Sequence, residues 1–163
     1  MTTPAPVDLF HVRDHAFKKK PGKKPRGCAE CNRARHAMVH VGAPQSLNAA
    51  ASQSTRFAYD NQKKAWQERL TKLLKESGLP KGLVAVRARG QVCFPDRRDR
   101  DQGNYRFLIE KALGDALEEG DWISNDDWTR YQFGDLEYAY DKGQSWTALT
   151  IFPQATLLGD VGG

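Results

Sequence analysis

The stretch Asn104-Tyr-Arg-Phe-Leu-Ile-Glu-Lys111-Ala-Leu-Gly-Asp115-Ala-Leu117 decides the fold, because its apolar residues recur at helical spacing. The periodicity continues to about Glu119 and follows a turn expected at Gln102-Gly103. A second stripe of residues, at spacings of three, four and seven along the helix, has two interpretations. Its side chains either point into a functional site or form a solvated face that contains a Lys–Asp pair. The core-facing residues are expected to be Ile109, Ala112, Leu113, Ala116 and Leu117, and the second stripe holds Asn104, Leu108, Lys111 and Asp115.

Carboxylates on both sides of this helix favour a site over a solvated face. Asp99 and Asp101 precede the helix, and Asp126-Asp127 follow it after a short loop. Mg²⁺ prefers such hard oxygen ligands, and a polyanion prefers arginines, which stand among these acids at Arg97, Arg98 and Arg100. We therefore expect the acids to meet at one end of a compact unit and to hold Mg²⁺ against a polyanion.

The rest of the chain predicts a second helix and a small mixed sheet. Residues 55–78 have an amphipathic helical pattern that ends at Gly78-Leu-Pro80, with Trp66 in the core or a dimer contact. Strands are expected at 83–89 and 91–94 around a turn at Gly90, and a strand over 129–140 is expected to kink at Gly134. A turn at 141–143 would then form a terminal hairpin with a strand through 146–152. The pattern favours an α+β fold in which helices pack on this sheet.

In order, these motifs resemble the core of the RusA-type Holliday junction resolvases, particularly the phage-encoded ones. That core reads Arg-Asp-x-Asp-Asn, then Lys-x-x-x-Asp-Ala-Leu, then Gly-(hydrophobic)-x-x-Asp-Asp. The chain has Arg98-Asp99-Arg100-Asp101, then Lys111 to Leu117, then Gly120-Asp-Trp-Ile123 leading to Asp126-Asp127. The resemblance covers roughly residues 40 to 153, and it includes Pro95-Asp96-Arg97-Arg98 and Pro44-Gln-Ser46-Leu-Asn48.

The resemblance implies a homodimeric, Mg²⁺-dependent endonuclease that cuts four-way DNA junctions. Its catalytic residues would be Asp99, Asp101, Lys111 and Asp127. Asp99, Asp101 and Asp127 would hold Mg²⁺, and Asp115 and Asp126 are further candidate ligands. The DNA would contact Asn104 and the three arginines beside the acids.

The chain departs from the family pattern between the acids and the lysine. Gln102-Gly103 separates Asp101 from Asn104, and the helix before Lys111 is about a turn or more longer. Either Asp99 and Asp101 are the paired acids, or Asp101 and Asn104 match the first acid and the asparagine, with Gly103 in place of an acid. Asp101 is functional in both alignments.

The N-terminal segment contains a candidate zinc site. Cys28 and Cys31 form a Cys-x-x-Cys pair, and all four histidines of the chain lie in the same segment. Zn²⁺ in structural sites takes four such ligands, whereas the alternative is a redox-inert thiol pair in a surface loop. The expected ligands are Cys28, Cys31, His36 and His40, with His15 as a substitute.

Between His15 and this cysteine pair runs a basic stretch that ends at Arg26. It is either a solubilising loop or an arm that contacts DNA phosphates. The candidate contacts are Lys18, Lys19, Lys20, Lys23 and Lys24.

Composition bounds the class of protein. At 163 residues and 39% hydrophobic, one domain with its own core is expected, and the net charge of +5 is concentrated near the N-terminus and at 86–100. No apolar run could span a membrane and the first residues lack a signal peptide, so we expect a bacterial cytoplasm, that of a phage host. We expect a basic segment with the zinc site at 1–42, a nuclease domain at 43–155 and a loose tail at 156–163. The alternatives are a non-catalytic DNA-binding protein and a zinc-stabilised phage interaction protein.

Overall fold

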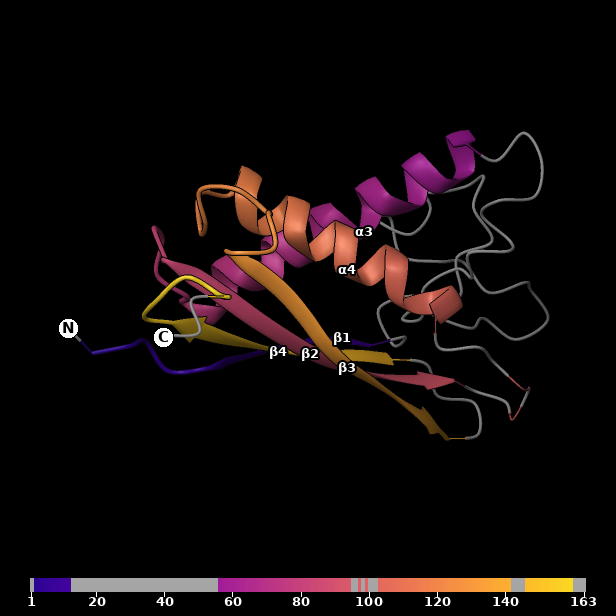
Figure 1. The fold of residues 1–163 in the computed structure, drawn as a ribbon. Helices are drawn as coiled ribbons and strands as arrows, with labels where there is room; N and C mark the ends of the chain where they lie inside the picture. Colours follow the sequence, from indigo (N-terminus) through magenta and orange to yellow (C-terminus); the bar gives the residue numbers. More distant parts are fainter. Residues whose placement is uncertain are drawn as a thin grey trace.

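The computed structural model describes residues 2–12, 56–94, 97, 99, 103–141 and 146–159. Two helices cover one face of a four-stranded mixed sheet, which confirms the α+β class (Figure 1). In chain order the elements are β1 (Val7–Val12), α3 (Arg56–Ser77), β2 (Ala85–Phe94), α4 (Gly103–Glu119), β3 (Tyr131–Tyr140) and β4 (Trp146–Gln154). Both predicted helices are confirmed to within about two residues at each end.

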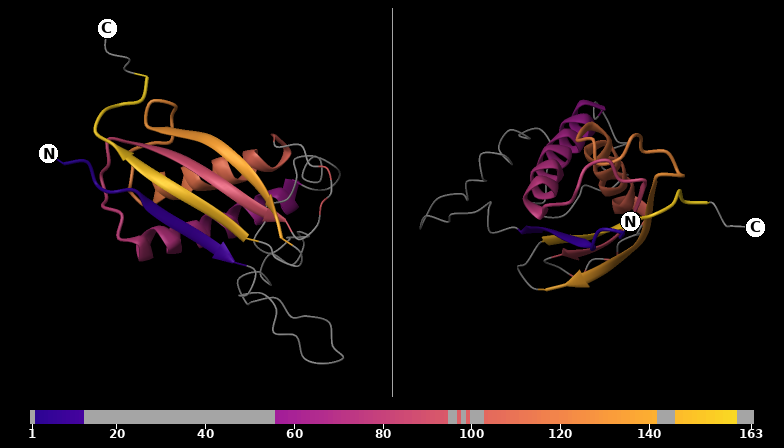
Figure 2. Two further views of the ribbon diagram at one scale, coloured as in Figure 1. Left: turned by 90° about the horizontal axis from the view of Figure 1, so that it is seen from below. Right: turned by 90° about the vertical axis from the view of Figure 1, so that its left-hand side faces the viewer.

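The sheet has the strand order β1-β4-β2-β3. β2 and β3 are parallel, and α4 connects them across the sheet, while β4 is antiparallel to both β2 and β1. The predicted hairpin between β3 and β4 is therefore wrong. β4 lies on the other side of β2, because α4 returns the chain to a parallel β3 at the edge of the sheet (Figure 2).

The predicted turn at Gly90 is also wrong, because β2 continues through it and pairs with β4 without a break. A Cβ at Gly90 would lie 2.7 Å from Cδ2 of Leu149, so glycine serves a close approach between strands rather than a turn. The kink at Gly134 is confirmed as a β-bulge. Between the pairs Ala88↔Phe133 and Gly90↔Leu136, β2 advances by two residues and β3 by three.

The core lies between the sheet and the helices. α3 buries Trp66, Leu70 and Leu74, which confirms the core position of the tryptophan. All five residues predicted to face the core from α4 are fully buried, but Leu108 is fully buried as well. Leu108 therefore belongs to the apolar face of α4 rather than to the predicted polar stripe.

The first strand was not predicted. Val7–Val12 pairs with β4, and Leu9 is buried in the same core as the helices. At the other end of the chain, Leu158 is buried and its N–H donates to the carbonyl of Thr129. The boundary expected at residue 42 lies outside the described residues. In the ranges that the structure describes, no helix is both long and apolar enough to cross a bilayer.

Candidate functional site

The centre of the candidate site is Lys111, on the middle of α4. Its Nζ donates to Oδ1 of Asp115, one turn along the same helix, at 2.8 Å, and to Oδ2 of Asp126 at 2.9 Å. Lys63 of α3 donates to the second oxygen of Asp115 at 2.8 Å. We call Lys63, Lys111, Asp115 and Asp126 the Lys111 network.

Asp126, in the loop after α4, is held against that helix. Its backbone N–H donates to Oε2 of Glu118 at 3.2 Å. Beside it, Gly114 lets the loop approach α4, because a Cβ there would lie 3.2 Å from Oδ2 of Asp126 and 3.0 Å from the ring of Tyr131. The Tyr131 hydroxyl donates to the carbonyl of Glu110, which fixes the start of β3 against α4. A buried hydroxyl with this bond stays protonated, since burial raises the pKa of Tyr131.

The charges of the network stabilise one another. Burial alone would raise the pKa of Asp115, whose side chain is 16% exposed, but hydrogen bonds from Lys111 and Lys63 lower it overall. Hydrogen bonds to Asp115 and then Asp126 raise the pKa of Lys111 above its usual range. Lys111 therefore stays a cation, although half of its side chain is exposed to solvent.

Asp127 has a different local role from Asp126. Its Oδ1 accepts hydrogen bonds from the N–H and the hydroxyl of Thr129, which lower the pKa of its exposed carboxyl. Its carbonyl accepts the N–H groups of Arg130 and Tyr131. Asp127 thus closes the turn that leads into β3, and Asp126 is the acid of this pair that contacts Lys111.

The acids and arginines before α4 are described only in part. Arg97 lies 4.8 Å from the ring centre of Tyr140, at the last residue of β3, and Asp99 is exposed. Asn104 lies in the first turn of α4. The predicted site residues outside the described ranges are Asp101, Arg98 and Arg100, the zinc candidates Cys28, Cys31, His15, His36 and His40, and the five arm lysines Lys18, Lys19, Lys20, Lys23 and Lys24.

The network fits part of a site for a divalent cation. Asp115 and Asp126 direct one oxygen each at a single cation, the ammonium of Lys111, and carboxylate oxygens are the ligands that Mg²⁺ prefers. Among the described residues no three His, Cys, Asp or Glu side chains gather in a metal-binding group. A third acid would have to join them, and the predicted ones are Asp99, Asp101 and Asp127.

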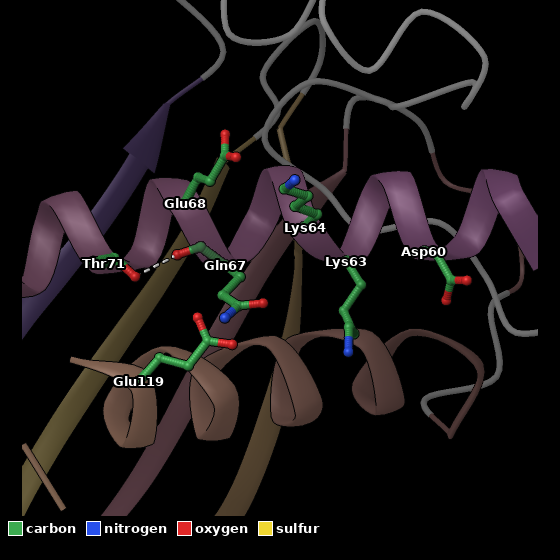
Figure 3. Close-up of a pocket in the computed structure, with 7 residues that line it drawn as sticks. All are labelled: Asp60, Lys63, Lys64, Gln67, Glu68, Thr71 and Glu119. Carbon is green, nitrogen blue, oxygen red and sulfur yellow. Dashed lines mark hydrogen bonds between the residues drawn. The ribbon is translucent and has the colours of Figure 1, made fainter. Parts of the chain in front are cut away.

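A groove between the two helices leads toward the network. It has a volume of about 600 Å³ and only polar side chains line it (Figure 3). Lys63 and Gln67 extend from α3 toward α4, where Glu119 forms the facing wall. The sequence did not point to Lys63, because its partner Asp115 is 52 residues away and no local spacing connects them. Gly114 and Tyr131 were missed for the same reason.

Comparisons of the chain with protein-family models and with curated proteins find no match.

Proposed function

We propose that the chain is a Mg²⁺-dependent endonuclease of the RusA type that cuts four-way junctions and other branched DNA. One observation supports this most. Nζ of Lys111 lies 2.8 Å from Oδ1 of Asp115, the aspartate of its own Lys-x-x-x-Asp motif, and 2.9 Å from Oδ2 of Asp126, an acid of the later Asp-Asp motif. Motif residues that are separate in the sequence are thus neighbours in the fold, as a shared site requires.

Asp126 and Asp115 would hold the metal together with Asp101, and with Asp99 or Asp127 as further ligands. The metal would polarise the scissile phosphate and lower the pKa of the attacking water. Lys111 is kept protonated by its hydrogen bonds to two carboxylates, and its charge would stabilise negative charge that develops on the phosphate. Arg97, Arg98 and Arg100 would orient the scissile strand.

A four-way junction contains two symmetry-related scissile strands. A homodimer with a two-fold axis would place one site on each strand. The basic arm would add phosphate contacts, and the zinc site would hold the N-terminal segment that carries the arm. Such an enzyme would act in recombination, repair or packaging of phage DNA in the host cytoplasm.

The second candidate is a non-catalytic DNA-binding protein, and one observation favours it. The carboxylate oxygens that face Lys111 already accept its hydrogen bonds, and Asp115 accepts a further one from Lys63. A network in which every charge has a partner also suits a purely structural role.

Cleavage of a labelled four-way junction, measured beside a linear duplex of the same sequence, separates the two candidates. With Mg²⁺ the protein should cut the junction and spare the duplex. Asp126→Asn and Asp101→Asn should each lower the cleavage rate by about a hundredfold or more while junction binding persists, because loss of a negative charge reduces repulsion of phosphate.

Glu118→Gln is the matched control. It removes the charge of Glu118 but keeps a side-chain oxygen that can accept the backbone N–H of Asp126, and it leaves the charges of the Lys111 network unchanged. Its cleavage rate should stay close to that of the unaltered protein. Junction binding without cleavage in Mg²⁺ or Mn²⁺ would favour the non-catalytic candidate, and normal cleavage by both Asn variants would exclude this site.

A further inference from the structure

Trp128 is the most exposed of the large apolar side chains that the structure describes, at 67%. By contrast, Trp66 and Trp122 are buried in the core. Single exposed apolar residues are common on protein surfaces, so the surroundings of Trp128 decide whether its exposure has a function. Trp128 lies two residues after Asp126, in the loop that delivers this acid to Lys111.

The backbone around Trp128 is held on both sides. Before it, the carbonyl of Asp127 accepts N–H groups from Arg130 and Tyr131 at 3.0 and 2.8 Å. The carbonyl of Trp128 itself accepts a hydrogen bond from Nε2 of Gln132 at 3.1 Å. The ring is therefore presented from a fixed turn rather than from a loose loop.

The ring is also supported by the chain near its C-terminal end. A Cβ at Gly159 would lie 2.3 Å from Cζ3 of Trp128, so the glycine backbone packs directly against the six-membered ring. Gly159 has a φ of 86°, a conformation that suits glycine, and the N–H of Leu158 donates to Thr129 at 2.6 Å. The ring thus has a fixed support, and two-thirds of the side chain stays open to a ligand.

The neighbours of Trp128 in the turn are polar. Asp127, Thr129 and Arg130 flank it in sequence, and none of them is an apolar residue. Protein–protein interfaces need a contiguous patch with an apolar centre. A single fixed ring among polar groups suits a planar ligand better, because stacking on one face needs no wider apolar surface.

We propose that Trp128 is a stacking platform for an unpaired base of nucleic acid, next to the Lys111 network. This inference rests on the proposed function, which takes branched DNA as the substrate. Unpaired bases occur where strands open at a branch, and every base has a π face that an aromatic ring can hold. Arg130, two residues further on, donates from Nη1 to the carbonyl of Val84 at 3.2 Å, and its positive charge would face the phosphates of that strand.

Equilibrium binding of the full-length protein, without added Mg²⁺, tests the platform. The probes are a short oligothymidylate, a four-way junction and a blunt duplex, and a Trp128→Ala variant is compared with Trp128→Phe. We expect Trp128→Ala to weaken binding to the oligothymidylate and the junction about tenfold or more, and binding to the duplex by less than twofold. Trp128→Phe should stay within about threefold, and tryptophan fluorescence should be quenched by oligothymidylate except in the two variants.

Phe10→Ala is the matched control, because Phe10 is also an exposed aromatic residue but lies on β1. Its binding should be unchanged, and thermal unfolding should show that all variants fold. Normal oligothymidylate binding by Trp128→Ala, or an equal loss for all three DNAs, would overturn the platform. Failure of the unaltered protein to bind oligothymidylate would also overturn the platform. Cleavage is not the readout, so an uncleaved junction would count against the enzyme alone.

Discussion

Nζ of Lys63 lies 2.8 Å from Oδ2 of Asp115, and this contact joins α3 to α4 across 52 residues of sequence. The other oxygen of Asp115 binds Lys111. One partly buried carboxylate therefore connects the packing of the two helices with the position of the lysine in the candidate site. A change at Asp115 should affect stability and the site together.

Asp115→Asn should lower the free energy of unfolding by about 1–3 kcal/mol at pH 7, because two lysines lose their shared counter-charge. The effect should depend on pH. The pKa of Asp115 is lowered in the folded protein, so its contribution is complete above the unfolded value of about 3.9 and is lost as the pH falls through the lower folded value. Urea denaturation between pH 7 and pH 2.5 should show the two proteins converging below about pH 4.

The exposed pair Arg106–Glu110 on the same helix supplies the control for this prediction. Glu110→Gln should change stability by less than about 1 kcal/mol, as exposed ion pairs do. A difference between Asp115→Asn and the unaltered protein that stayed constant down to pH 2.5 would contradict the assigned charge pairing.

Lys111→Met should lower the junction cleavage rate by about a hundredfold or more, since it removes the cation that faces both carboxylates. The pKa of Lys111 is raised above its usual range, so the ammonium should persist at alkaline pH. The rate of single-turnover cleavage should therefore not fall between pH 8 and pH 10 through deprotonation of Lys111. The unaltered protein and Lys111→Arg should show the same dependence of the rate on pH in this range. Loss of activity in that range, with activity retained by the arginine variant, would mean that the pKa of Lys111 is lowered rather than raised.

Gly114→Ala tests how closely the loop after α4 must approach the helix. Alanine is favoured over glycine in a helix interior by about 1 kcal/mol, but the added Cβ would press on Asp126 and Tyr131 at 3.0–3.2 Å. The two effects should nearly cancel in stability, whereas cleavage should fall several-fold because Asp126 is displaced from Lys111. A thermal unfolding curve and a cleavage assay of the same sample measure both, and unchanged cleavage would show that the loop adapts.

Local patterns sufficed for the helices, for the core face of α4 apart from Leu108, and for the bulge at Gly134, because helical periodicity and glycine positions depend on neighbouring residues. The order of the strands was not accessible in that way. β4 pairs with β1 and β2 rather than with β3, and such long-range pairing depends on how α4 crosses the sheet. The local pattern led to a wrong prediction of a turn at Gly90. Its close neighbour Leu149 belongs to a strand that comes 59 residues later in the chain (149 − 90 = 59).

The candidate site shows the same division. The Lys111–Asp115 pair follows from helical spacing alone, and the contact with Asp126 agrees with the expectation that acids after the helix return to it. Lys63 enters through helix packing, which no spacing along the chain encodes. The paired acids before α4, the zinc ligands and the basic arm remain predictions from the sequence.

Zinc is predicted at Cys28 and Cys31 with two nearby histidines, which lie outside the described residues. Protein purified without chelators should contain about one zinc per chain by elemental analysis, as a closed four-ligand site requires. Cys28→Ser should lower both zinc content and stability, while Cys93→Ser, at a buried cysteine in β2, should leave the zinc content unchanged. The site would be excluded if the purified protein contained no zinc and Cys28→Ser were as stable as the unaltered protein.

The arm at Lys18–Arg26 and the arginines before α4 should contribute to DNA binding in different ways. Phosphate contacts release counterions and carry no sequence information, so deletion of 18–26 should weaken binding to junction and duplex alike and should flatten the dependence of affinity on salt. Arg97→Ala should affect cleavage more than binding, because an arginine beside the acids would orient the scissile strand within reach of the metal. Titrations from 50 to 300 mM salt, with the dimer confirmed by light scattering, measure both effects. If the dependence of DNA affinity on salt concentration were unchanged after the deletion, the arm would not contact DNA phosphates. A monomeric protein at assay concentration would argue against paired incision of the junction.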